Sequence, residues 1–405
     1  MNKPDDVVIT GMGVVSPIGI GLDAFWASLR EGRSGVRTLD QFAECRVKFG
    51  GEVQDFDPKR YVKPRKSLKV MCREIQLAYA ACAMAIEHAG LDIQAGERNR
   101  LGVVLGSEMH YSTPEELIAV CSHCLTDGRF DFDQWGQYAM KDISPLWLLK
   151  YLPNMAACHI AIAIDARGPN NSIVLGEASS LLAVMEAASI IRRGWADMML
   201  TGGVGSRIHI ASVLFRGDAN LSHRNDNPSA ACRPFDQIRD GTVNSEGAGA
   251  MMLESRAHAE ARGARILGRV LNGASSFGRR PDRLTAASRP IERSVHQALA
   301  RSGLGSEQLS HVNAHGISTV DNDAIEAQAI HNVLGEVPVT APKSFFGNIG
   351  GGAGAVEAVV SLLALRAHEI PRTLNFETPD ARCPINVVRE PTSCQKRTAL
   401  LLNQS

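Results

Sequence analysis

The sequence is poor in aromatic residues and carries no net charge. Aromatic side chains make up 5% of the 405 residues, and 43 basic side chains balance 43 acidic ones. Proteins that bind nucleic acid or an anionic membrane surface through phosphate groups usually carry a basic excess. We therefore expect neither kind of partner for this chain.

The sequence also lacks the marks of export and of membrane insertion. The first residues, MNKPDDVVITGMG, have no apolar signal core after their one lysine. We expect no apolar run of the ~18 residues that a membrane span needs. The nine cysteines are an odd number, and without a leader they fit a reduced compartment. The sequence therefore predicts a cytoplasmic protein.

Small and apolar residues are abundant, and they follow an alternating pattern. The chain has 37 glycines and 44% hydrophobic residues, a mixture that suits close packing of helices on sheets. Short runs that are apolar on both sides alternate with helical patterns, which favours an α/β fold with a parallel-type sheet covered on both faces. The predicted strands are Val7–Thr10 (ended by Gly11-Met12-Gly13), Leu101–Leu105, Ile173–Leu175, Met198–Thr201, Ala248–Leu253 and Val312–Ala314. The predicted helices include Leu22–Arg30, Glu74–Gly90, Ala178–Arg193, Asp323–Asn332 and Ala355–Arg366.

Two loop-to-helix junctions occupy similar places in the two parts of the chain. One lies at Glu177 and the other near Asn348, and each precedes a helix rich in small residues. This similarity suggests an internal duplication. We assign residues 1–253 to an N-terminal half and residues 254–405 to a C-terminal half.

Glu177 lies at the turn between a predicted strand and a predicted helix, in the segment GPNNSIVLGEASSLL. The partial positive charge at a helix N-terminus stabilises an anion. In an enzyme, the same position lowers the pKa of a thiol or holds an oxyanion. The simpler interpretation is a carboxylate that caps the helix, which is the commoner use of such a residue.

Three further polar residues follow predicted strands or turns in the second half. His315 comes directly after a strand and before Gly316, and ligand sites in α/β sheets lie at such strand ends. Lys343 precedes a turn, and Asn348 opens the glycine-rich loop NIGGGAG, whose N–H groups suit a carbonyl or enolate oxygen. The alternatives are a core histidine bonded to the backbone and glycines that allow close packing.

Taken together and in order, these segments resemble the β-ketoacyl-acyl-carrier-protein synthases, or ketosynthases. The resemblance covers nearly the whole chain. It is carried by GMGVVSPIG near the N-terminus, ACRPFDQIRDGTVNSEGAGAMMLES in the middle, and HGIST, KSFFG and GAGAVEA in the second half. It implies the thiolase fold, in which five alternating helix and sheet layers, αβαβα, are built from two duplicated halves. It also implies a two-fold dimer in which the strand before Glu177 approaches the partner subunit.

The resemblance implies a role for each candidate residue. In the family, a cysteine at the position of Glu177 accepts an acyl chain, which a carrier protein delivers on phosphopantetheine. His315 and Asn348 match the two residues that promote decarboxylation of a malonyl thioester and stabilise the enolate. Lys343 matches a lysine beside them, and Glu326, Gly316 and Gly347 are supporting residues. No bound cofactor is implied, and the expected partners are an acyl carrier protein and a second ketosynthase-type subunit.

The chain departs from the family pattern at these positions. A carboxylate at Glu177 would form a mixed anhydride, which is high in energy, so we expect no ordinary covalent acyl transfer. The elongating ketosynthases usually have a histidine at the position of Asn348, but an amide N–H also donates to an enolate oxygen. An ionised Glu177 would pair with His315 and Lys343 and raise the pKa of His315, whereas a buried, protonated Glu177 would donate a hydrogen bond. The sequence leaves both states open.

Two other features are weaker. The chain stops at LLLNQS, where family members usually continue into a glycine- and phenylalanine-rich gating loop and a last strand, so that loop and strand are expected to be absent. The segment Cys121-Ser-His-Cys124, with His110 and His159 elsewhere, is one half of a zinc pattern without a second half. We expect no metal site.

Three functional hypotheses follow. The first is a ketosynthase-like subunit without condensing activity, which pairs as a chain-length factor with a Cys-containing ketosynthase. The second is a malonyl-carrier-protein decarboxylase that uses His315 and Asn348. The third, ranked lowest, is condensation without a covalent intermediate, with Glu177 or His315 as the base. Homodimer and heterodimer, acyl chain length and pathway stay open.

Overall fold

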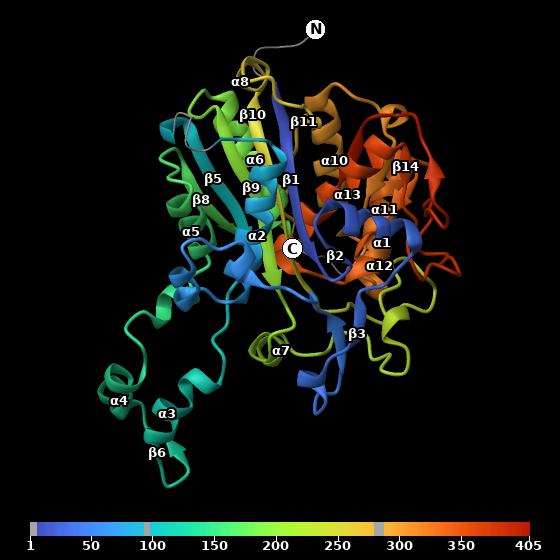
Figure 1. The fold of residues 1–405 in the computed structure, drawn as a ribbon. Coiled ribbons are helices and arrows are strands. Elements are labelled where there is room, and N and C mark those ends of the chain that lie inside the picture. The colour runs from blue at the N-terminus through green and yellow to red at the C-terminus, as the bar shows by residue number, and fades with distance from the viewer. Residues whose placement is uncertain (1–5, 93–97, 279–286) are drawn as a thin grey trace.

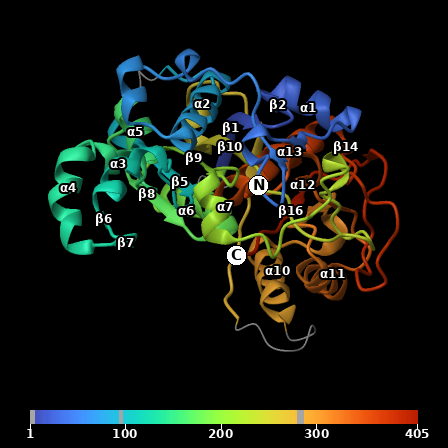
Figure 2. The ribbon, with the colours of Figure 1, turned by 90° about the horizontal axis from the view of Figure 1, so that it is seen from below.

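Two sheets and three layers of helices alternate through the molecule (Figures 1 and 2). The structure is a computed structural model that describes residues 6–92, 98–278 and 287–405. The first five residues of the N-terminal stretch discussed above lie outside this range. Figure 2 shows the order of the layers, from α2 through β1 and β10 to α13, and then to α10 and α11 on the opposite side.

The larger sheet has seven strands and mixes parallel and antiparallel pairs. β5 pairs in parallel with β8 and β9, whereas β10 pairs antiparallel with both β9 and β1. In spatial order its strands are β11 (Gly268–Val270), β1 (Val7–Ser16), β10 (Glu246–Ser255), β9 (Met198–Ser206), β5 (Leu101–Ser107) and β8 (Asn170–Val174), with β2 (Gly19–Ile20) paired to β1.

Helices cover both faces of this sheet because its central strands are apolar on both sides. One face is covered by α2 (Arg73–His88) and α5 (Met155–Ala163), and the other by α6 (Ser179–Arg192) and α13 (Ala353–Ala367). The second sheet is parallel and consists of β13 (Val339–Thr340), β12 (His311–Asn313) and β16 (Ala399–Leu401). It lies between α13 on one side and α10 (Arg289–Ser302) and α11 (Val320–Leu334) on the other. These are the five αβαβα layers that the family resemblance implied.

The remaining α-helices and strands of the described residues are short. The helices are α1 (Leu22–Glu31), α3 (Glu115–His123), α4 (Trp135–Asp142), α7 (Ile210–Arg216), α8 (Arg256–Ala261) and α12 (Lys343–Phe346). Three small antiparallel sheets are formed by β3 (Val36–Thr38) with β4 (Phe49–Gly51), β6 (Leu125–Thr126) with β7 (Arg129–Phe130), and β14 (Glu369–Ile370) with β15 (Thr392–Ser393).

Three sequence predictions about these elements were wrong. The larger sheet is mixed rather than parallel, because burial on both faces depends on the covering helices and not on strand direction. β1 does not end at Gly11-Met12-Gly13 but continues to Ser16. One stretch, Gly350–Ala367, does reach 18 residues with a mean hydropathy of 1.3. Of this stretch, 72% is buried in the protein, because it includes α13, which lies between the two sheets.

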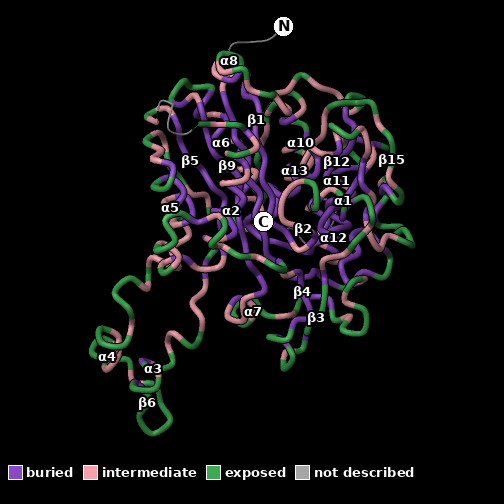
Figure 3. The backbone as a smooth tube through the Cα atoms, viewed as in Figure 1, coloured by how far each residue is buried: buried purple, intermediate pink, exposed green. Residues whose placement is uncertain are grey.

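Residues 111–151 form a lobe that projects from the layered body (Figure 1). The lobe contains α3, β6, β7 and α4, and most of its residues are exposed or half-buried (Figure 3). Several of its exposed side chains are large and apolar, namely Ile118, Leu125, Phe130, Phe132, Met140, Leu146 and Leu148. A free surface of this composition is typical of a contact face for another chain.

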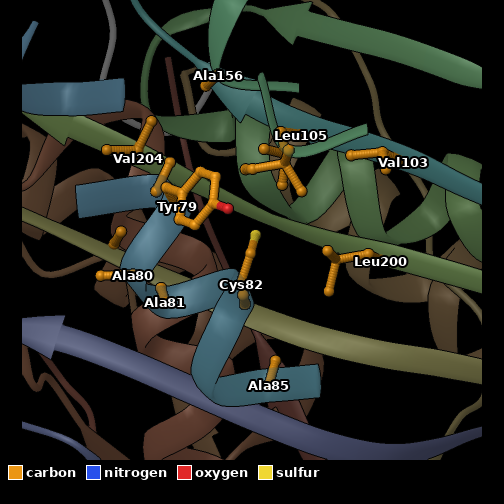
Figure 4. Close-up of a cluster of buried hydrophobic side chains, with 14 of the residues drawn as sticks. Tyr79, Ala80, Ala81, Cys82, Ala85, Val103, Leu105, Ala156, Leu200 and Val204 are labelled. Carbon is orange, nitrogen blue, oxygen red and sulfur yellow. The ribbon is translucent and has the colours of Figure 1, made fainter. Parts of the chain in front are cut away.

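The packing of α2 on the larger sheet depends on small side chains. Alanines and Cys82 on α2 face Val103, Leu105 and Leu200 on the strands, as Figure 4 shows. On β1, a Cβ atom added at Gly13 would overlap the carbonyl oxygen of Ala81 in α2. The backbone of the helix therefore lies directly against the backbone of the strand, which explains why the first strand contains glycine.

We predict that Gly13→Ala lowers the free energy of unfolding by ~1–3 kcal/mol, because the added methyl group forces α2 away from β1. Urea denaturation measures this change. The matched control is Gly136→Ala in α4, where an added Cβ meets no atom within 4 Å. An equal loss in both variants would show that the approach of α2 to β1 is not tight.

Candidate active site

Three polar side chains converge where neighbouring strands of the larger sheet end. β8, β5 and β9 are parallel neighbours, so their carboxyl ends lie at one edge of the sheet. Glu108 directly follows β5, Arg207 directly follows β9, and Glu177 lies in a one-turn 3₁₀ helix (Gly176–Ala178) between β8 and α6. The strand order therefore brings two carboxylates and one guanidinium together.

The Arg207 guanidinium joins the two carboxylates. Its Nη1 lies 2.6 Å from Oε1 of Glu177, and its Nη2 lies 2.9 Å from Oε2 of Glu108. The Arg207 and Glu108 side chains are only 7% and 6% exposed, while that of Glu177 is 17% exposed. Arg216 at the end of α7 adds a second cation, 2.7 Å from Glu108. Glu177, Arg207, Glu108 and Arg216 thus form a chain of alternating charges, which we call the charge chain.

Glu177 is ionised at neutral pH. Burial alone would raise its pKa, but the charge and hydrogen bond of Arg207, with smaller contributions from His315 and Asn348, lower the pKa of Glu177 to about 2. Burial in turn lowers the pKa of Arg207, and the two carboxylates more than offset this effect. The structure therefore selects the ionised form of Glu177, which the sequence left open.

The second half of the chain supplies a buried histidine. His315 follows β12, and its backbone N–H and that of Gly316 donate to Glu326 in α11 at 2.6 and 2.8 Å. Lys343 in α12 donates to the carbonyl oxygen of His315 at 2.8 Å and lies 3.3 Å from its Nδ1. Because an ammonium group can only donate, Nδ1 accepts and the imidazole proton is on Nε2.

The electrostatic prediction for His315 was wrong. Lys343 pairs with Glu357 in α13, and Glu177 pairs with Arg207, so Glu177 forms the predicted ion pair with neither His315 nor Lys343. Burial and the charge of Lys343 hold the pKa of His315 well below its usual value, although Glu177 opposes this shift. The side chain is therefore a neutral imidazole at physiological pH.

Asn348 turns its amide toward Glu177. Its Oδ1 accepts a hydrogen bond from the Gly350 N–H at 3.0 Å, which leaves Nδ2 to donate to Oε1 of Glu177 at 3.2 Å. The preceding residue, Gly347, has a φ of +80°, which an L-residue with a side chain rarely adopts. Gly347 therefore allows the turn between α12 and the glycine-rich loop, and so places Asn348.

The predicted site residues thus gather in one region. The Glu326 side chain fixes His315 by accepting hydrogen bonds from the backbone N–H groups of His315 and Gly316. Burial raises the pKa of Glu326 to about 8, although these two hydrogen bonds oppose the shift. A cavity of about 1850 Å³ opens beside the site and is lined by Glu177 and His315, together with apolar residues that include Leu181, Leu182, Met185, Leu267 and Ile325. Asn348 and Lys343 lie behind this lining.

Sequence reasoning missed Glu108, Arg207 and Arg216. In the structure, each of the first two directly follows a strand, but the predicted strands ended at Leu105 and Thr201, three and six residues earlier, so the signal was weak. Arg216 lies on a short exposed helix and had no such signal. Among the described residues, no group of three or more His, Cys, Asp or Glu side chains is arranged to hold a metal ion.

The pattern of strands, turns and buried residues has counterparts in known proteins. A family model described as the β-ketoacyl synthase N-terminal domain matches residues 4–259, and one described as the C-terminal domain matches residues 267–377. The chain belongs to the β-ketoacyl synthase family. The 3-oxoacyl-[acyl-carrier-protein] synthase 2 of Synechocystis sp. is 34% identical over 94% of this chain and 90% of its own length. The corresponding protein of Vibrio cholerae is 33% identical over 94% and 91%.

Solved structures confirm the ketosynthase-type thiolase fold. The ishigamide ketosynthase/chain length factor superposes with a TM-score of 0.82 at 30% identity, covering 97% of this chain and 94% of that one. A type II polyketide synthase acyl-carrier protein in complex with its ketosynthase gives 0.80 at 29%, covering 98% and 96%. The chemical roles of Glu177, His315, Asn348 and Lys343, and the boundary between halves at residue 253, stay predictions.

We predict that Arg207→Gln lowers the free energy of unfolding by ~3–5 kcal/mol at neutral pH, because it leaves buried carboxylates without their shared cation. Arg193→Gln is the control, since its pair with Glu186 is exposed and should cost ~0–1 kcal/mol. Urea denaturation at several pH values measures both.

The pH dependence of this loss follows from the lowered pKa of Glu177. The stability that its ionised form contributes is fully present above the ordinary carboxyl pKa of ~4.3 and is lost as the pH falls toward about 2. The difference between the parent chain and Arg207→Gln should therefore shrink below that ordinary value. A difference that stays constant down to the acid limit would contradict the ion pair.

We also predict that Glu177→Cys places an activated thiol in this site. The Arg207 guanidinium and the N-terminus of the 14-residue helix α6 should lower the thiol pKa at least ~1 unit below its usual ~8.5. The rate of iodoacetamide alkylation against pH, followed by peptide mass spectrometry, measures this pKa. Leu175→Cys, exposed and two residues away, is the control, and equal pKa values in both variants would refute the prediction.

Proposed function

We propose that this β-ketoacyl synthase family member is a chain-length-factor-like partner subunit that lacks Cys-dependent condensation. The observation that carries the proposal is the state of Glu177, which by resemblance stands at the position of the nucleophilic cysteine. It is ionised and bound to Arg207 and Asn348. Acylation would convert it into an uncharged mixed anhydride and remove one of the two carboxylates that neutralise Arg207.

The shape of the molecule supports a partner role. β8 is an outer strand that pairs only with β5 among the described residues, and its last residue, Val174, and the following Leu175 are exposed. The lobe adds further exposed apolar side chains, with Phe132 at 80% and Met140 at 86% exposure. A second ketosynthase-type chain would cover both surfaces. The similarity to a solved ketosynthase/chain length factor points to the same kind of pairing.

The cavity supports a role in determining the length of an acyl chain. It is bounded by apolar side chains of α6 and α13 and reaches Glu177 and His315. An acyl chain delivered by a carrier protein on phosphopantetheine would find an apolar wall there. The family shown for the chain, and its solved relative in complex with an acyl-carrier protein, favour such a carrier as the second partner.

The second candidate function is decarboxylation of a malonyl-carrier protein. A neutral His315 with its proton on Nε2 favours it, because that N–H suits an enolate oxygen. Two observations count against it. The Nδ2 of Asn348 already donates to Glu177, and the negative charge of Glu177 repels a malonyl carboxylate. Non-covalent condensation ranks lowest, because both candidate bases are weak: the pKa of Glu177 is about 2, and the pKa of His315 is held well below its usual value by burial and Lys343.

We predict that the purified chain, incubated with a malonyl-loaded carrier protein, produces no loss of CO₂ in an intact-mass measurement, since no donor pair is free to hold the enolate. A Cys-containing ketosynthase known to decarboxylate the same substrate is the positive control. Loss of CO₂ that disappears in His315→Ala would establish the decarboxylase and overturn the partner-subunit proposal.

We predict that the chain co-purifies in equal amounts with a Cys-containing ketosynthase from the same organism, and that Leu182→Phe shifts the products of the complex toward shorter acyl chains by filling the cavity. Product masses measure the shift. Leu214→Phe is the control, because Leu214 is an exposed residue of α7 outside the cavity lining. A failure to associate, or the same product lengths in both variants, would contradict the proposal.

A further inference from the structure

Arg207 and Asn348 present two N–H donors to one point in space. Arg207 Nη1 lies 2.6 Å and Asn348 Nδ2 lies 3.2 Å from the same oxygen, Oε1 of Glu177. Both donors are held from behind, Arg207 by Glu108 and Asn348 by the Gly350 N–H. Donors fixed in this way need little reorganisation to bind an anion, and one of them carries a charge.

The Oε1 atom of Glu177 occupies this point, but the carboxylate does not use all of its hydrogen-bonding capacity. Its Oε2 makes no hydrogen bond to any residue that the structure describes, and the side chain lines the large cavity. The occupied point is therefore connected to a space from which a small molecule can enter. The two donors and the cavity together have the form of a binding site that is already filled.

The charges around this site would be unbalanced without Glu177. Arg207 and Arg216 would then share the single carboxylate of Glu108. Arg207 and Glu108 are almost completely buried, so little solvent screens the remaining positive charge. A buried, uncompensated cation favours the uptake of an anion of suitable size.

We propose that Arg207 and Asn348 form a binding site for a small carboxylate and that the Glu177 side chain is its built-in occupant. While Glu177 is in place, the site excludes the carboxylate of any other molecule that enters the cavity, including that of a short dicarboxylic acyl group. The geometry of the two donors is the same whether or not the chain acts as a partner subunit.

The test is to remove the occupant and to supply its missing part. Glu177→Ala keeps Cβ and removes a CH₂–COO⁻ group, for which acetate is the free counterpart. We expect sodium acetate to raise the Tm of Glu177→Ala above the value in sodium chloride at the same concentration and neutral pH. Acetamide, which has nearly the same shape without the charge, should not raise the Tm. The parent chain should respond equally to acetate and chloride.

Two controls separate binding at this site from a general salt effect. Glu177→Gln still fills the site with an uncharged side chain, so acetate should give it no specific increase in Tm. In the Glu177→Ala background, Asn348→Ala removes one donor and should weaken acetate binding ~10-fold, measured by titration of ¹³C-labelled acetate in NMR spectra.

The inference is overturned if Glu177→Ala responds equally to acetate and chloride, or if Glu177→Gln gains as much from acetate as Glu177→Ala does. Should Glu177→Ala not fold, Glu177→Ser keeps a polar group in the turn and takes the same test. These outcomes are independent of whether the chain associates with a ketosynthase, so failure of the proposed function and failure of this inference are distinguishable.

Discussion

The buried guanidinium of Arg207 is shared between Glu108 and Glu177, and the properties of the candidate site depend on this sharing. It keeps Glu177 ionised despite burial, and it fixes the carboxylate where Asn348 can donate to it. Because the negative charge of Glu177 is matched by Arg207, it is not available to His315 as an ion-pair partner. Burial and Lys343 then determine the state of the imidazole, which stays neutral.

The fold makes this arrangement possible through strand order and through small residues. Three parallel strands, β8, β5 and β9, end at one edge, so that Glu108, Arg207 and the turn that carries Glu177 lie together. Glycines and alanines let α2 lie against the sheet. The second half then brings Asn348 into contact with Glu177 and places His315, held by Lys343, in the lining of the same cavity, so that the site is assembled from both parts of the chain.

Much of this architecture could be predicted from the sequence, because short segments of neighbouring residues determine the individual strands and turns. The runs around Val104 and Leu200 are apolar on both sides, and they are strands because helices cover both faces. His315 and Asn348 were recognised because each follows a strand or opens a glycine-rich turn. Strand direction could not be predicted, because burial is the same in either direction. The partner of Glu177 could not be predicted either, because Arg207 lies 30 positions away in sequence and only the parallel pairing of β5 with its neighbours brings the two together.

The charge chain links four positions that lie on separate segments of the sequence, and this has a consequence for how the family can vary. Each member compensates its neighbour, so the effects of substituting them are not additive. A related protein with an uncharged residue at the position of Glu177 has an excess cation unless the position of Arg207 or Arg216 changes as well. Among homologues, these four positions should therefore change together, and their joint pattern would identify the members that carry the same charge chain.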